Sequence, residues 1–202
     1  MNKVFKLSAS VCAAVALHLP ALAAPIVDQN NPTPGAPFCA VTTTDWCGQS
    51  FQQTNSTISG AGIYLMGSEG GRTDPATLTI SIYDGYSPSG LSGLVASGTT
   101  AIDGNFFGFV DIFWTPAAVS AGTQYYMVLA SSNNAFAAFS PTPSYANGSA
   151  LFRGTDYGQS YDLTFRTFAD DGAAQAVPEP GALALLGLGF VGLFGASRRK
   201  RA

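Results

Sequence analysis

The sequence predicts an all-β fold, an antiparallel β-sandwich of jelly-roll type over residues 38–169. Short apolar segments recur at intervals of about ten residues, as in proteins built from many short strands. Clusters of Gly, Pro, Asn, Asp and Ser separate these segments. No stretch of residues 25–175 shows the spacing of an amphipathic helix. A signal peptide is expected before the sandwich, and one transmembrane helix after it.

Residues 1–23 have the features of a secretory signal peptide. Lys3 and Lys6 supply a positively charged start, an apolar run follows, and residues 21–23 read Ala-Leu-Ala. Small residues at this spacing are typical of a signal-peptide cleavage site. We therefore expect export of the chain, with loss of His18, the only histidine in the sequence.

The mature chain is expected to begin with an extended, proline-rich leader at residues 24–37 rather than with a packed element. Cys39 and Cys47 follow it. An exported protein meets oxidising conditions, so a disulfide between them is expected, closing a loop of about nine residues. A metal site is the alternative, but the mature chain offers no histidine or third cysteine to complete one.

The clearest strand covers residues 76–83, where apolar residues alternate with Thr and Ser. This period of two predicts a strand with one buried face. Residues 106–114 are apolar on both faces, which predicts a central strand that ends at Pro116. Further strands are expected near Phe51 and at residues 59–66, 94–100, 125–130, 135–139 and 149–152.

A last strand is expected at residues 161–168, where two sets of side chains alternate. Tyr161, Leu163 and Phe165 would form its buried face. The intervening Asp162, Thr164 and Arg166 would then face water.

The charge of the mature module is strongly negative. Residues 24–175 contain eleven Asp or Glu but only three basic residues, Arg72, Arg153 and Arg166. Such a surface repels nucleic acids and anionic lipids, so no nucleic-acid partner is expected.

The residue types that remain after export favour a protein without enzymatic activity. Without histidine, Ser-His-Asp and Cys-His catalysis are excluded, and oxidised cysteines would supply no thiolate. Two carboxylates suffice for glycoside hydrolysis, so an aspartate-dependent polysaccharide hydrolase stays open as an alternative. Glu69 is the only glutamate of the module and lies in a Gly-rich turn, which is typical of a solvated charge.

No cofactor is expected, although two kinds of ligand stay open. Calcium takes oxygen ligands from loops, but the sequence has no D-x-D-x-D-G run. The turn residues that could bind it are Asp84, Asp103, Asn105, Asp156, Asp170 and Asp171. Carbohydrate could stack on aromatic rings in or near loops, at Tyr86, Tyr145, Tyr157 and Tyr161. Turn geometry and core packing are the competing explanations for the two sets.

The end of the chain has three consecutive parts after a small polar linker at residues 170–176. Val177, Pro178, Glu179 and Pro180 form a stiff, extended segment. Residues 181–197 are uncharged and would form a helix about 26 Å long, close to the ~30 Å of a bilayer core. Four cations follow the helix and would hold its C-terminal end in the cytoplasm: Arg198, Arg199, Lys200 and Arg201.

This order of parts in residues 177–202 resembles the PEP-CTERM protein-sorting signal of Gram-negative bacteria. The resemblance implies a single-pass inner-membrane precursor that exosortase, a membrane-embedded cysteine transpeptidase, recognises and processes. The protein would then reach the cell surface or an extracellular matrix, with the exopolysaccharide of a biofilm as a candidate partner. The strands at residues 77–83, 121–129 and 162–167 resemble those of bacterial choice-of-anchor extracellular modules, a resemblance that implies a surface β-sandwich and assigns no ligand.

Overall fold

The computed structural model describes residues 24–67, 74–87, 90–140, 144–153, 155–156 and 160–170. The predicted signal peptide at 1–23, residues 171–176 of the linker, and the sorting segment at 177–202 with its transmembrane helix at 181–197 lie outside these ranges. No helix in the described ranges has the length and apolar character that a membrane crossing requires.

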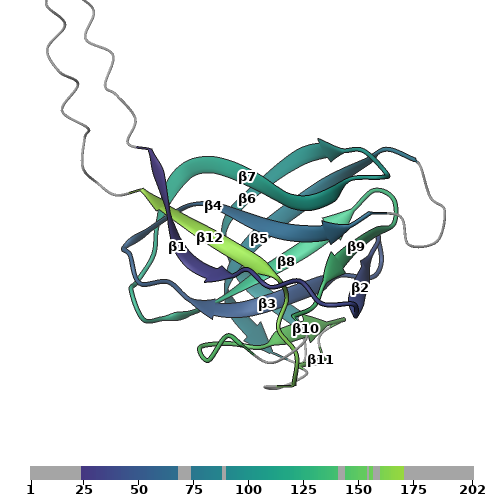
Figure 1. The fold of residues 1–202 in the computed structure, drawn as a ribbon. Helices are drawn as coiled ribbons and strands as arrows, with labels where there is room; N and C mark the ends of the chain where they lie inside the picture. Colours follow the sequence, from purple (N-terminus) through teal and green to yellow (C-terminus); the bar gives the residue numbers. More distant parts are fainter. Residues whose placement is uncertain are drawn as a thin grey trace, which may run out of the picture. The chain divides into compact units, whose positions relative to one another are not determined.

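The described residues form two antiparallel six-stranded sheets and no helix, which confirms the predicted all-β class. Sheet A has the order β1-β12-β4-β9-β2, with β7 also paired to β4, and sheet B has the order β11-β10-β3-β8-β5-β6 (Figure 1). The strands are β1 (Pro25–Asn31), β2 (Phe38–Val41), β3 (Cys47–Gln52), β4 (Thr57–Met66), β5 (Ala76–Ser87), β6 (Gly90–Ile102), β7 (Phe107–Ala118), β8 (Gln124–Ser131), β9 (Ala135–Ala138), β10 (Ala150–Phe152), β11 (Thr155–Asp156) and β12 (Phe165–Asp170).

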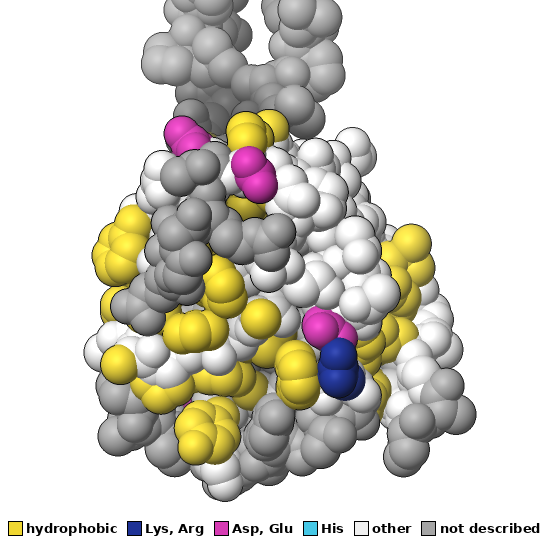
Figure 2. Space-filling model, turned by 90° about the vertical axis from the view of Figure 1, so that its right-hand side faces the viewer, with side chains coloured by type: hydrophobic (Ala, Val, Ile, Leu, Met, Phe, Trp, Pro, Cys, Tyr) yellow, Lys and Arg dark blue, Asp and Glu magenta, His cyan; other side chains and the backbone are white. Residues whose placement is uncertain are grey.

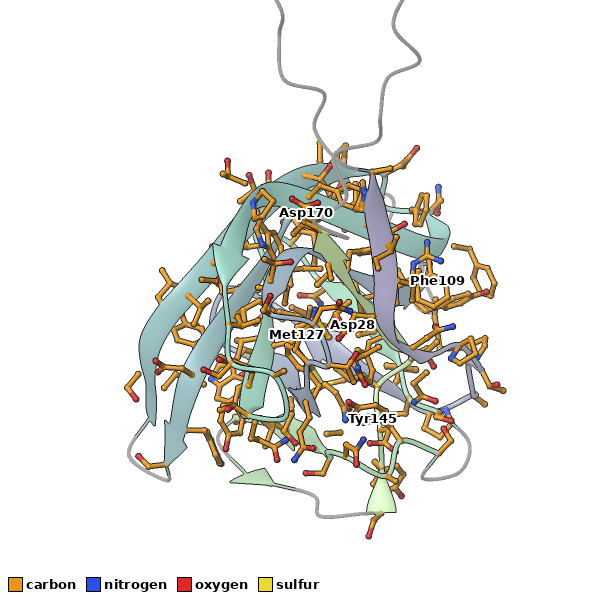
Figure 3. The ribbon with its side chains drawn as sticks, turned by 90° about the vertical axis from the view of Figure 1, so that its left-hand side faces the viewer. Asp28, Phe109, Met127, Tyr145 and Asp170 are labelled. Atoms are coloured by element: carbon orange, nitrogen blue, oxygen red, sulfur yellow. A yellow bond between two sulfur atoms is a disulfide. The ribbon has the colours of Figure 1, made fainter. Side chains whose placement is uncertain are left out.

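The core lies between the inner faces of the two sheets. Sheet A contributes Ile63 and Phe165, and sheet B contributes Ile80 and Met127, all fully buried. Figure 3 shows Met127 in the interior, between the strands of the two sheets. The predicted alternation on residues 76–83 is confirmed, since its three aliphatic side chains are buried in this core. A β-sandwich-like fold results, because each sheet covers the apolar face of the other.

The expected leader at residues 24–37 is wrong in one respect, because part of it is packed. Residues 25–31 form β1, which pairs antiparallel with β12, and the two strands lie side by side in Figure 1. Gln29 and Asn31 are buried, and the Asn31 side chain donates to the Leu163 carbonyl at 2.8 Å. Pro25 is tolerated in β1 because it is the first residue of an edge strand.

The expectation of a central strand at residues 106–114 is also wrong. β7 pairs only with β4 in the described structure and forms an edge of sheet A. Its inner face, with Val110 and Ile112, is buried, whereas the Phe113 side chain on its outer face is half exposed. Pro116 does not end the strand, because it lies where the register between β4 and β7 is broken and no ladder bond is required.

The predicted alternation over residues 161–168 holds only from Phe165 onward, where β12 begins. Asp162 and Thr164 were expected to face water, but they are 1% and 0% exposed. Tyr161, expected to be buried, is 42% exposed. The reason is that residues 161–164 approach the sheets as an irregular segment, in which the side chains of Asp162 and Thr164 are hydrogen-bonded to other parts of the chain.

Candidate functional site on the outer face of sheet A

The sorting residues predicted from the sequence lie outside the described ranges. They are Val177, Pro178, Glu179 and Pro180 in the motif and Arg198, Arg199, Lys200 and Arg201 after the apolar run. The predicted disulfide between Cys39 and Cys47 is present, with the two Cα atoms 6.3 Å apart. Because β2 belongs to sheet A and β3 to sheet B, this bond links the two sheets.

The aspartates proposed as calcium ligands are not brought together where the structure describes them. Asp84 lies in β5, Asp103 precedes β7, and Asp170 ends β12. No group of three His, Cys, Asp or Glu side chains in the described ranges could hold a metal ion. Asp171 lies outside those ranges, as does the side chain of Asp156. The calcium alternative therefore has no ligand set in the described structure.

Tyr145, one of the tyrosines considered for sugar stacking, is instead part of the core packing. Its hydroxyl donates to Gln29 Oε1 at 2.8 Å and accepts from the Gln52 backbone N–H at 3.1 Å. Burial raises the pKa of this hydroxyl, the Gln52 hydrogen bond opposes that rise, and the charges of Asp28 and Asp162 add to it. Tyr145, labelled in Figure 3, is partly buried and its ring packs on Phe165 with centroids 5.0 Å apart, so core packing, the competing explanation, accounts for this residue.

Two of the other loop tyrosines pack against neighbouring aromatic rings. The Tyr86 ring packs on Tyr126 of β8, with centroids 5.3 Å apart. Tyr161 packs on Phe139, with centroids 5.4 Å apart. Tyr157 lies outside the described residues.

A different set of aromatic rings gathers on the outer face of sheet A. Successive side chains of a strand alternate between faces, so the burial of Val110 and Ile112 turns the odd-numbered residues of β7 outward. Figure 3 shows Phe109 on the outer side of the ribbon, well away from the interior Met127. We call the following set the outer aromatic face: Tyr64, Phe107, Phe109, Asp111, Phe113, Arg166 and Phe168.

Two glycines of β4 allow side chains from the flanking strands to meet over it. A Cβ atom on Gly60 would lie 2.7 Å from the Phe113 ring and 2.8 Å from the Ile112 carbonyl oxygen. A Cβ atom on Gly62 would collide with the Asp111 carboxylate and lie 3.1 Å from Cγ of Arg166. Glycine is required at both positions because these side chains pass directly over the backbone.

The centre of the outer aromatic face is an ion pair. Arg166 of β12 donates through Nε to Asp111 Oδ1 at 2.7 Å and through Nη2 to Asp111 Oδ2 at 2.5 Å. The guanidinium carbon of Arg166 also lies 4.3 Å from the Phe109 ring centroid and 5.6 Å from that of Phe168. The bidentate Arg166–Asp111 pair and the two rings beside the guanidinium fix these four side chains in one arrangement.

Edge-to-face and tilted contacts extend the set on either side. Tyr64 meets Phe107 and Phe109 edge to face, with centroid distances of 5.4 and 5.3 Å. Phe113 packs on Phe168, with centroids 4.9 Å apart. Such arrangements are the favoured ones for aromatic pairs. The face therefore presents ordered rings around a neutralised charge pair.

The sequence pattern does not predict this face. The two apolar faces of residues 106–114 predict a strand buried on both sides, although one of them faces outward. The available indication was the Gly-x-Gly of Gly60 and Gly62, which marks a close approach of neighbouring groups but does not identify them. The face depends on the pairing of β4 with β7 and β12, which the sequence does not give.

Charged groups are sparse among the described residues on one face of the module. Figure 2 shows hydrophobic side chains spread over one side of the module, with few acidic or basic groups among them. One contact between opposite charges joins Arg153 and Asp45.

Comparison with known proteins identifies the part of the chain beyond the module. A PEP-CTERM protein-sorting motif is found at residues 176–200. No curated protein matches the chain. The motif implies exosortase as the processing enzyme, with export and membrane anchoring before processing. Residues 176–200 are therefore similar to the PEP-CTERM sorting signals of exosortase substrates.

Proposed function

We propose that this chain is an exported, non-enzymatic protein of the cell surface or extracellular matrix that exosortase processes at its C-terminal signal. The PEP-CTERM motif at residues 176–200 carries this proposal. It follows closely on β12, the last described strand of a β-sandwich-like module, which ends at Asp170. Because Asp170 belongs to β12, the expected linker at 170–176 is reduced to residues 171–176. A small polar linker would expose the motif to a membrane enzyme.

Each part of the signal has a role in the proposal. Residues 177–180 supply the motif that exosortase recognises. Residues 181–197 form one helix that retains the precursor in the inner membrane, after residues 1–23 have directed export. Residues 198–201 hold the end of that helix on the cytoplasmic side.

The absence of enzymatic activity is the second part of the proposal. The sequence supports it, because the only histidine, His18, lies in the proposed signal peptide. The disulfide supports it too, because neither Cys39 nor Cys47 offers a thiolate nucleophile. An aspartate-dependent polysaccharide hydrolase is the alternative, and it would release reducing sugar from a polysaccharide that the proposed protein leaves intact.

Replacement of one motif residue tests the sorting proposal. Glu179→Ala should leave the precursor at full size in the membrane fraction of exosortase-containing cells, whereas the native protein is shortened and leaves the membrane. Glu69→Ala is the matched control, since it removes the module's own glutamate far from the motif in sequence. Normal shortening and release of the Glu179→Ala protein would contradict the proposed role of the motif.

Carbohydrate binding by the module is a second candidate function, and the outer aromatic face favours it. The exposed rings of this face replace the loop tyrosines as the candidate stacking surface, because Tyr145 is occupied in the core. In this function the module would bind the exopolysaccharide matrix into which it is delivered.

We also propose that the strands of the module wind as in a jelly roll and that its fold is related to the choice-of-anchor modules.

A further inference from the structure

We propose that the outer aromatic face binds an uncharged polysaccharide chain, with sugar rings against Phe107 and Phe113 and sugar hydroxyls against Arg166 and Asp111. This inference rests on the second candidate function and names its site and ligand class. It concerns the module alone and does not depend on where exosortase cleaves.

The exposure of two phenylalanine rings is the first observation. Phe107 is 64% and Phe113 is 52% exposed, although burial of a phenylalanine side chain is worth about 1.5–3 kcal/mol. The two lie six residues apart on one face of β7, which is about 20 Å along a strand. A row of this length matches an extended polymer better than a single sugar.

The fixed positions of these rings are the second observation. Phe107 is held edge to face by Tyr64, and Phe113 is held by Phe168. Between them, Arg166 is fixed by two hydrogen bonds to Asp111 and by the Phe109 ring. A surface whose side chains are already ordered loses little conformational entropy on binding. The fixed side chains of this face therefore favour the binding of a ligand.

The hydrogen-bonding capacity at the centre fits hydroxyl groups. The two bonds to Asp111 use two of the five N–H groups of the Arg166 guanidinium. The Arg166 and Asp111 side chains are 29% and 23% exposed, so solvent reaches both. A sugar hydroxyl both donates and accepts, so it could pair with the carboxylate and the guanidinium at once. An apolar partner surface would instead remove water from the N–H groups and carboxylate lone pairs that the Arg166–Asp111 pair leaves unused, at a cost.

The negative charge of the module favours an uncharged polysaccharide over anionic ligands that could also contact aromatic rings. The arginine and aspartate of the face neutralise each other. The surrounding module carries eleven acidic and three basic residues in positions 24–175. A uronic-acid polymer, a nucleic acid or an anionic membrane would be repelled by this field. A neutral polysaccharide experiences no such repulsion.

Binding of the full-length chain to defined polymers tests the proposal. The protein in detergent micelles is applied to immobilised galactomannan, hydroxyethyl cellulose and dextran, with alginate as the anionic probe. We expect binding to at least one of the three neutral polymers and none to alginate. Phe107→Ala and Phe113→Ala should each raise Kd about three- to tenfold. Phe113→Tyr, which keeps an aromatic ring, should bind like the native protein.

Leu94→Ala is the matched control, because Leu94 is 61% exposed but lies on β6 of sheet B. It should leave Kd unchanged, and all four variants should remain folded at the temperature of the binding measurement. Three results would overturn the proposal: no binding to any neutral polymer at millimolar sugar, binding to alginate alone, or equal losses of affinity for Leu94→Ala and Phe107→Ala. A fourth is an oligomer of the native chain that Phe107→Ala dissociates, since the face would then join two copies.

The outcome is distinguishable from that of the sorting proposal. Glu179→Ala should bind neutral polymer with the native Kd even though it is not processed. If Glu179→Ala is not processed but still binds the polymer, the binding inference stands. If the native protein is processed but binds no neutral polymer, the binding inference fails and the sorting proposal is unaffected.

Discussion

Gln49 and Asp162 form a buried hydrogen bond between residues 113 positions apart, with Gln49 Nε2 donating to Asp162 Oδ1 at 2.9 Å. Gln49 Oε1 in turn accepts from the Leu163 backbone N–H at 2.7 Å. Asp162 Oδ2 accepts from the backbone N–H groups of Ser144 and Tyr145, both at 3.0 Å. One carboxylate thus fixes the segment after β9, the segment before β12 and strand β3.

Replacement of Asp162 should therefore destabilise the fold more than other aspartate changes. Asp162→Asn has one acceptor oxygen where donors meet both carboxylate oxygens, so its amide NH₂ must face either the Gln49 Nε2 donor or the two backbone N–H groups. We therefore expect a loss of about 2–3 kcal/mol in the free energy of unfolding. Asp103→Asn, at an exposed turn, is the control and should change it by less than about 0.5 kcal/mol. Chemical denaturation measures both, and equal effects would contradict the assigned role of Asp162.

The disulfide between Cys39 and Cys47 should contribute measurably to stability. A loop of about nine residues corresponds to about 2.5 kcal/mol in the chain-entropy treatment. The Cys39→Ala, Cys47→Ala double variant should lose about this amount, and a reductant should lower the native melting temperature but not that of the variant. A melting temperature of the native protein that is insensitive to full reduction would contradict this expectation.

Gly60 should be intolerant of a larger side chain. Gly60→Ala would place Cβ against the Phe113 ring and the Ile112 carbonyl oxygen, and we expect a loss of about 1–3 kcal/mol. Phe113→Ala in the same chain should recover part of this loss, because it removes the ring but not the carbonyl. A double-mutant cycle measures the coupling. Strict additivity of the two changes would show that the ring does not lie over Gly60.

The Asp28 carboxylate should make stability depend on pH in the acid range. Burial acts to raise its pKa, but hydrogen bonds from Thr54, Gln29 and Asn55 outweigh burial and lower the pKa below its ordinary value of 3.8. A pKa lowered in the folded state adds stability that is present above the unfolded value and is lost as pH falls through the folded one.

Asp28→Asn is the variant that isolates this contribution. The native protein should be the more stable of the two at neutral pH, and the difference should shrink as the pH falls below 3.8. Urea denaturation at a series of pH values measures it. A difference that grows in acid would mean that the folded-state pKa is raised, contrary to the hydrogen-bond pattern.

The features that the sequence predicted correctly are those set by neighbouring residues. The alternation of residues 76–83 predicted a buried face, and the fold buries it. The pair Cys39 and Cys47 predicted a disulfide because only two cysteines follow the expected signal peptide. Both inferences use local spacing and chemistry, so they need no knowledge of which strands pair.

The features that could not be predicted from the sequence depend on contacts between residues far apart along the chain. β1 is held by β12, and the Gln29 backbone N–H donates to Thr167 Oγ1 across 138 positions. Asp162 is satisfied only because Gln49 lies beside it. The outer aromatic face similarly requires Gly62 to lie between Asp111 and Arg166, a register that no local pattern shows.

The central claim is that exosortase removes the C-terminal signal of an exported chain. Intact-mass measurement tests it most directly, on the protein released from cells with exosortase and on the protein kept in the inner membrane of cells without it. We predict a mature polypeptide that lacks residues 1–23 and everything after a cut near residues 178–180 in the first case, and retention of residues 181–202 in the second. A full-length polypeptide in the cytoplasm with both ends intact would contradict the account.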